Sequence, residues 1–167
     1  MTAEKTAPPH APAEESKPLP RLGEIGLKNF PPYLMNRIMG RYNAALREEM
    51  AAHGLTTAKM RTLAVLSVLD GLLIRDLSVY AVVEQSTLSR ALDALERDGL
   101  IERKTDPDDN RATRIFMTRN GRETHDELWP HVAEACAQMF KGIEPDEQRA
   151  FTATLQKILR NVRVNQF

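Results

Sequence analysis

The sequence predicts a mainly α-helical protein with a small two-stranded β-wing. Three observations lead to this fold class. Apolar residues recur at helical spacing over most of the chain after residue 30. Gly99 and a change of period interrupt that pattern. Two short segments, one of them rich in β-branched residues, then flank a run of turn residues, Asp106-Pro107-Asp108-Asp109-Asn110.

The composition fits one globular domain with an extension. The chain has 167 residues, of which 42% are hydrophobic, and its basic and acidic residues balance at 23 each. Net charge therefore argues neither for nor against nucleic acid, and any basic surface must be local. The single cysteine, Cys136, argues against a disulfide framework, so we expect a cytoplasmic protein. No stretch predicts a membrane span or a secretory signal, and no membrane partner is expected.

The N-terminal part divides into a tail and a helix. Residues 1–22 hold five of the ten prolines and little that could be buried, which predicts a disordered tail. Pro31 and Pro32 suit the first turn of a helix. Apolar residues continue that helix on one broad face, and Gly54 is its expected stop.

Two short helices should follow. Thr56 or Thr57 can cap the first of them, whose apolar positions run from Met60 to Leu69. Asp70-Gly71 is typical of a turn. The second short helix should cover Ile74 to about Ala81.

Residues 86–98 form the most informative segment, a helix without glycine or proline. Leu88, Ala91, Leu92 and Leu95 share one face of it. The opposite face is defined by short polar residues and two arginines, namely Ser86, Ser89, Arg90, Asp93 and Arg97. Short hydroxyl side chains allow close approach to another surface, and arginine can bind guanine or phosphate in a bidentate way. Helix capping is the alternative explanation for Ser86 and Thr87, but it does not account for Ser89 and Arg90.

A locally basic hairpin should come next. Leu100 to Arg103 predicts one strand and Thr113 to Met117 the return strand. Six basic residues gather within residues 103–122, against three acidic ones at Asp106, Asp108 and Asp109. The basic residues are Arg103, Lys104, Arg111, Arg114, Arg119 and Arg122.

The C-terminal part predicts two long helices. Thr118 can cap the first, which Pro130 should kink or divide and Gly142 should end. Pro145 suits the start of the second. The apolar stripe of this last helix has no obvious partner within the chain, which favours packing against a second copy: Phe151, Leu155, Ile158, Leu159 and Val162.

The order of these elements and several short sequence motifs resemble those of the MarR family of winged helix-turn-helix regulators. The motifs are Gln-Ser-Thr-Leu-Ser-Arg-Ala-Leu-Asp at 85–93, Leu-Glu-Arg-Asp-Gly-Leu-Ile at 95–101 and Arg-Lys at 103–104. They continue with Asp-Pro-Asp-Asp-Asn-Arg at 106–111 and Thr-Arg-Asn-Gly-Arg at 118–122. The match covers about residues 30–165.

The resemblance implies a homodimer that binds double-stranded DNA, typically as a repressor at a pseudo-palindromic operator. Small phenolic or carboxylate effectors, or oxidants, would release it. It implies a winged helix-turn-helix DNA-binding domain at 56–117. Dimerisation helices would occupy 23–55, which would also border a ligand cleft, and 118–167.

The resemblance also implies which residues contact DNA. A recognition helix in the major groove would present Gln85, Ser86, Thr87, Ser89, Arg90, Asp93 and Arg97. The wing would contribute Lys104, Asp109 and Arg111, with Arg111 in the minor groove and Asp109 holding it in position.

Two positions depart from the family pattern. Asn110 stands where a second wing arginine is usual, which removes one charge. Val82 stands where a glycine is common before the recognition helix, and a β-branched residue disfavours positive φ. Either the turn takes another form or the alignment slips there.

Other functions find weaker support. Residues 106–117 begin like a calcium loop, but Arg111 and Met117 replace the required glycine and glutamate. His125, His131 and Cys136 lack ligand spacing, and no catalytic motif occurs, so we expect no enzyme, metal or cofactor.

Core packing is the default interpretation for Cys136, Trp129, Tyr33 and Tyr42, rather than redox sensing or a ligand cleft. The main rival function is a dimeric helical protein-interaction module with a vestigial DNA surface. Such a module would lack the strong salt dependence of DNA binding.

Overall fold

The computed structural model describes residues 20–164, so nearly all of the predicted tail at 1–22 lies outside the described residues. The chain divides into two units, residues 1–38 and 39–167. In the first unit, a short helix α1 (Leu22–Ile25) and a 3-10 helix (Leu27–Asn29) precede the start of α2 (Pro31–Ala52). The sequence did not predict these two short helices. The prediction that Pro31 and Pro32 open a long helix is confirmed.

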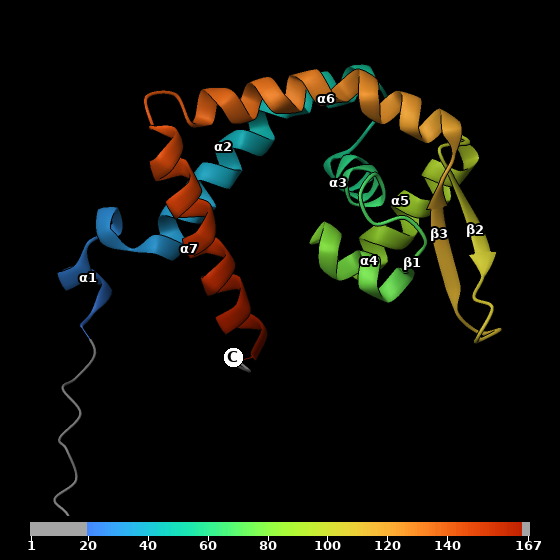
Figure 1. Cartoon of the computed structure of the whole chain (residues 1–167), viewed down its shortest axis with the longest axis horizontal. Helices are drawn as coiled ribbons and strands as arrows, with labels where there is room; N and C mark the ends of the chain where they lie inside the picture. The colour runs from blue at the N-terminus through green and yellow to red at the C-terminus, as the bar shows by residue number, and fades with distance from the viewer. Residues whose placement is uncertain (1–19, 165–167) are drawn as a thin grey trace, which may run out of the picture. The chain divides into compact units, whose positions relative to one another are not determined.

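The second unit contains the rest of α2 and every later element. Helices α3 (Thr57–Leu66), α4 (Ile74–Ala81) and α5 (Gln85–Arg97) follow, with strand β1 (Leu72–Leu73) between α3 and α4. Strands β2 (Ile101–Thr105) and β3 (Thr113–Met117) form a hairpin, and β3 leads into α6 (Arg119–Met139) and then α7 (Pro145–Val164). Figure 1 shows α3, α4 and α5 gathered beside this hairpin.

The core of this unit is aliphatic. Its most deeply buried side chains come from α3, α4, α5 and β3, and each is at most 1% exposed: Leu63, Leu66, Leu77, Leu88, Leu92, Leu95 and Ile115. The predicted buried face of α5 is confirmed, since Ala91 at 7% is its least buried member. Burial of this stripe fixes which face of α5 points outward.

The helix ends are set by local hydrogen bonds. The Thr56 hydroxyl accepts from the Lys59 amide at 3.3 Å, and the Thr118 hydroxyl accepts from the Gly121 amide at 3.0 Å. Both predicted caps are therefore confirmed. Pro130 lies inside α6 without dividing it.

The wing, residues 101–117, is an antiparallel hairpin. Ile101 pairs with Met117 and Thr105 with Thr113. The structure adds a third strand between the predicted turn at Asp70-Gly71 and the predicted helix from Ile74, because β1 pairs with β3 through Leu72 and Leu73. The sheet order is β1-β3-β2. Two residues carry too little pattern to identify a strand, so only the tertiary contact reveals it.

No helix among residues 20–164 is long and apolar enough to cross a membrane.

Candidate nucleic-acid interface

The outward face of α5 is exposed along its whole length. The side chains predicted for the recognition helix are all exposed: Gln85, Ser86, Thr87, Ser89, Arg90, Asp93 and Arg97. The Arg90 Nε donates to the Ser86 carbonyl at 3.3 Å, which lays its guanidinium along the helix. The capping explanation for Ser86 and Thr87 is wrong, because Glu84 is the N-cap residue and no side chain caps the helix.

The turn before α5 keeps a left-handed residue despite its valine. Val82 has φ 52° and ψ 52°, and it is the one non-glycine residue with positive φ in the described chain. The turn therefore takes the form that glycine would favour. Arg61 Nη1 donates to the Val82 carbonyl at 3.2 Å, and the Val83 amide donates to the Ser78 carbonyl at 3.1 Å. These bonds hold the spacing between α4 and α5.

Asp93 is engaged by the wing. Arg103 Nη2, from β2, donates to Asp93 Oδ1 at 2.7 Å, and Arg103 Nη1 donates to Glu96. Burial opposes the charge of Arg103, but these two carboxylates outweigh it and raise the pKa of the guanidinium. The charge of Asp93 is thereby partly neutralised, and α5 is tied to β2. The sequence did not predict this role of Arg103.

The wing tip is organised around Asp106, whose carboxylate is buried. Asp106 Oδ1 accepts from the amides of Asp108 at 2.8 Å and Asp109 at 3.0 Å. Asp106 Oδ2 accepts from Arg114 Nε at 2.5 Å. The Asp108 amide, then the Arg114 guanidinium and the Asp109 amide, hold the pKa of Asp106 below its ordinary value, against the opposing effect of burial. The tip is therefore a closed turn around a carboxylate.

Asp109 bonds to Arg111, although not as the sequence suggested. Its Oδ1 accepts from the Arg111 backbone amide at 3.0 Å, whereas the expected bond was to the guanidinium. Asp109 thus fixes the chain at the tip and leaves the Arg111 side chain exposed. Lys104 lies on the flank of the wing, with Nζ 2.6 Å from Glu102 and 4.8 Å from the centroid of the Phe116 ring.

An open groove of about 520 Å³ joins the wing to the starts of α4 and α5. Its lining brings together Arg75, Gln85 and Arg111. The Arg75 side chain is 78% exposed, and no sequence motif marks it as a site residue. Asp106, Asp108 and Asp109 line the same groove, so its positive groups are local, and an exposed arginine of this kind can contact a DNA phosphate.

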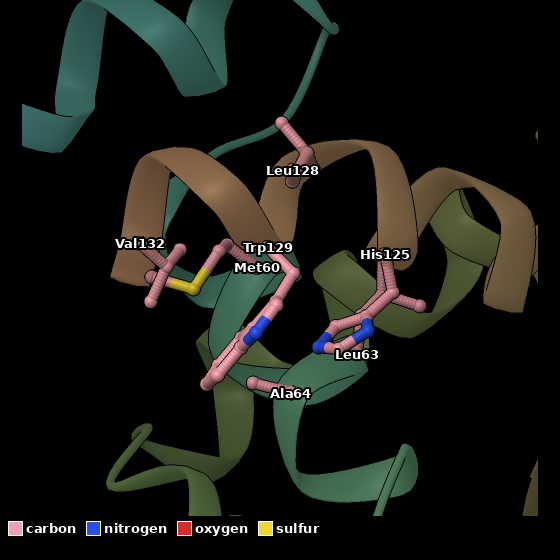
Figure 2. A pocket seen from close by; sticks show the side chains of 7 residues that line it. All are labelled: Met60, Leu63, Ala64, His125, Leu128, Trp129 and Val132. Carbon is pink, nitrogen blue, oxygen red and sulfur yellow. The ribbon is translucent and has the colours of Figure 1, made fainter. Parts of the chain in front are cut away.

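A second site, the α6 cavity, lies between α3 and α6 (Figure 2). It encloses about 30 Å³ and is lined by Met60, Leu63, Ala64, His125, Leu128, Trp129 and Val132. The rings of His125 and Trp129 stack with centroids 6.0 Å apart, and both project from α6 toward α3. Trp129 is 55% exposed, so core packing does not explain it.

A wider open cleft shares Trp129 and Val132 with this cavity. It also borders Tyr42, Cys136 and Phe140. Cys136 is half-buried there. Burial, and then the nearby Cys136, raise the pKa of Tyr42. Within residues 20–164, no cluster of three or more His, Cys, Asp or Glu side chains could hold a metal ion.

Comparisons with known proteins agree with this geometry. A sequence model of the MarR family matches residues 53–112. A solved MarR family transcriptional regulator from Silicibacter pomeroyi is 57% identical, with a TM-score of 0.82, and the match covers 89% of this chain and 100% of that one.

Two further relatives are more distant. CouR from Rhodococcus jostii RHA1, solved bound to p-coumaroyl-CoA, is 26% identical with a TM-score of 0.70, over 80% of this chain and 94% of that one. The HTH-type transcriptional repressor IacR of Pseudomonas putida is 23% identical over 86% of each chain.

The comparisons confirm the predicted fold, and they place the chain among regulators rather than enzymes. The helical body, the exposed face of α5 and the wing with its exposed Arg111 are those of a DNA-binding transcriptional regulator, and the chain belongs to the MarR family.

Proposed function

We propose that the chain is a homodimeric, ligand-responsive repressor that binds a pseudo-palindromic DNA operator. The observation that carries this proposal is the shared groove of α5 and the wing. Arg75, Gln85 and Arg111 line this groove, and the exposed face of short polar side chains on α5 continues from Gln85. A cytoplasmic location accords with a DNA-binding protein that carries one unpaired cysteine.

Within this proposal, Arg90 and Arg111 have different roles. Arg90, on α5, would contact a base edge in the major groove, with Ser86, Thr87 and Ser89 allowing close approach. Arg111 would enter the minor groove, where a narrow A·T-rich segment concentrates negative potential. Gln85 and Arg97 would flank the residues that contact bases. Lys104 would approach the DNA backbone. Asp93 would act through its bond to Arg103.

Replacing Arg111 by Ala tests the wing. We expect DNA binding to weaken by more than about tenfold and its salt dependence to become less steep, since one cation leaves the interface. Fluorescence anisotropy measures both quantities. Lys104→Ala is the matched control. Because Lys104 already contacts Glu102 and Phe116, this variant should lose less DNA affinity than Arg111→Ala. Unchanged affinity of the Arg111→Ala variant would remove the wing from the interface.

Replacing Arg90 by Ala tests base reading. We expect relaxed preference at one symmetric pair of operator positions, because a lost bidentate contact costs about 1–3 kcal/mol of discrimination. Binding to a set of singly substituted operators measures this. An equal loss on every sequence would mean that Arg90 contacts only phosphate.

The effector that releases DNA would bind at the α6 cavity. A space of about 30 Å³ holds roughly one water molecule, so an aromatic carboxylate must displace Trp129 or enter through the adjoining cleft. Its walls are apolar apart from the ring nitrogens of His125 and Trp129, which suits a small aromatic acid. That CouR was solved with p-coumaroyl-CoA, the thioester of an aromatic acid, supports an effector with an aromatic acyl group.

Trp129 is the only tryptophan of the chain and so reports on this cavity directly. We expect small aromatic carboxylates that release DNA to change its fluorescence over the same concentration range. His125→Ala should weaken that response, whereas His131→Ala, on an exposed part of α6, should not. DNA release without any change in fluorescence would place the effector elsewhere.

A further inference from the structure

Asp70 joins three elements that the sequence keeps apart. It lies between α3 and β1, and its carboxylate uses both oxygens. Oδ1 accepts from the Met117 amide of β3 at 2.8 Å, and Oδ2 accepts from Arg122 Nη2 of α6 at 2.6 Å. One side chain thus connects the root of the wing with the helix that lines the α6 cavity.

The first of these bonds extends the sheet. β1 pairs with β3 only at Leu72 and Leu73, and the Gly71 amide adds a bond to the Ile115 carbonyl at 3.0 Å. Two residues further along β3, the Asp70 carboxylate takes the place of a strand carbonyl. Met117 is 6% exposed, so its amide would be left without a partner if Asp70 moved away.

The other end of β3 is held to the same loop. Arg114 Nη1 donates to the Gly71 carbonyl at 2.9 Å, while its Nε donates to Asp106 at the wing tip. The Asp70-Gly71 loop is therefore hydrogen-bonded to β3 near both of its ends. Arg122 lies one helical turn before His125, so a shift of α6 at the cavity would move the partner of Asp70 directly.

We infer that Asp70 is a positioning residue for DNA binding: it makes the wing follow α6 and keeps Arg111 where it reaches DNA. This inference rests on the proposed function of Arg111. It also gives a physical connection between the α6 cavity and the wing, through Arg122, Asp70 and Met117.

The competing interpretation is electrostatic, and it predicts the opposite change in DNA affinity. If Arg122 simply contacted phosphate, removing the carboxylate of Asp70 would free a cation and tighten DNA binding. If Asp70 positions the wing, the same change weakens binding although it removes a negative charge. The isosteric substitution Asp70→Asn separates the two, because Asn can still accept from Met117 but faces Arg122 with an amide.

The test measures DNA affinity of the full chain by anisotropy. We expect Asp70→Asn and Arg122→Gln each to weaken binding about two- to fivefold, the range for a part-exposed ion pair, and the double variant to be no weaker than the singles. Glu123→Gln is the matched control, since its carboxylate pairs with Arg119 on the surface of α6 and should bind unchanged or tighter.

A double-mutant cycle locates the effect. Asp70→Asn should add nothing to Arg111→Ala, whereas it should add fully to Arg90→Ala, because only the wing is displaced. Additive loss with Arg111→Ala, or unchanged or tighter binding of Asp70→Asn alone, overturns the inference.

Hydrogen exchange of the DNA-free protein gives a readout that is independent of Arg111. Asp70→Asn should speed exchange of the β3 amides about twofold or more, and Glu123→Gln should not. Unchanged exchange overturns the inference. If instead Arg111→Ala itself has no effect on DNA binding, the proposed role of the wing fails while the exchange result still decides the role of Asp70.

Discussion

At the scale of the residue, Val82 carries backbone strain at the turn before α5. A β-branched side chain in the left-handed region costs about 1–2 kcal/mol, and the side chain is 75% exposed, so burial returns little. We expect Val82→Gly to raise the free energy of unfolding by about 0.5–1 kcal/mol, after the greater flexibility of glycine in the unfolded chain is subtracted. Urea unfolding at fixed protein concentration measures it. Lower stability of the glycine variant would contradict the assigned strain.

Gly121 presents the opposite case, a residue whose missing side chain is required. A Cβ there would lie 2.1 Å from the Leu100 carbonyl oxygen, where α6 crosses the start of the wing. We expect Gly121→Ala to lower the free energy of unfolding by about 2 kcal/mol or more, since backbone must move. Gly40→Ala is the control, because its Cβ meets nothing within 4 Å and the helix should gain slightly. Equal effects would show that the clash relaxes freely.

The residues that the sequence could not identify are those that act through distant partners. Leu88, Leu92 and the exposed α5 residues follow from helical period alone. The bond from Arg103 to Asp93 and the bonds of Asp70 to Met117 and Arg122 join positions far apart in the chain. Charged residues on a surface give no sign of their partners before the tertiary fold is known.

At the scale of the element, the wing depends on the ionised form of Asp106. Its folded pKa is lowered, first by the Asp108 amide, so its stabilising effect is complete above the ordinary pKa of 3.8 and is lost as pH falls through the lower folded value. We expect wild-type stability to fall more steeply below pH 3.8 than that of Asp106→Asn. Urea unfolding from pH 6 down to about pH 3 measures this. Parallel curves would contradict the role of Asp106.

Helices were predicted better than strands, for a physical reason. The starts of α2 and α7 follow from prolines, and those of α3 and α6 follow from their threonine caps. β1 has two residues and exists only through its pairing with β3. α1 and the 3-10 helix after it are likewise too short for periodicity to reveal.

At the scale of the whole molecule, the exposed stripe of α7 calls for a partner. In the single chain, four of its apolar side chains are between 37% and 53% exposed: Phe151, Ile158, Leu159 and Val162. We propose that a second copy covers them. Leu159→Asp should shift the protein to a monomer in sedimentation and weaken operator binding at least about tenfold, because half of the contacts are lost. Ala153→Asp, an exposed position on the opposite face of the same helix, is the control. A Leu159→Asp variant that remained a dimer would contradict this interface.

A dimer of this kind restricts the DNA it can bind. Two recognition helices in successive major grooves need half-sites about 10 bp apart, so the operator should be a pseudo-palindrome of roughly 16–20 bp. The neutral net charge of the chain means that affinity depends on the local basic groups of α5 and the wing.

Selection of binding sites from random duplex DNA, followed by anisotropy at about 50 and 200 mM salt, tests the central claim most directly. We expect one enriched pseudo-palindrome with half-sites about 10 bp apart, bound tightly and with a strong salt dependence that Arg111→Ala reduces. A pool without any enriched sequence, bound weakly and equally at every selection round, would contradict a sequence-specific regulator.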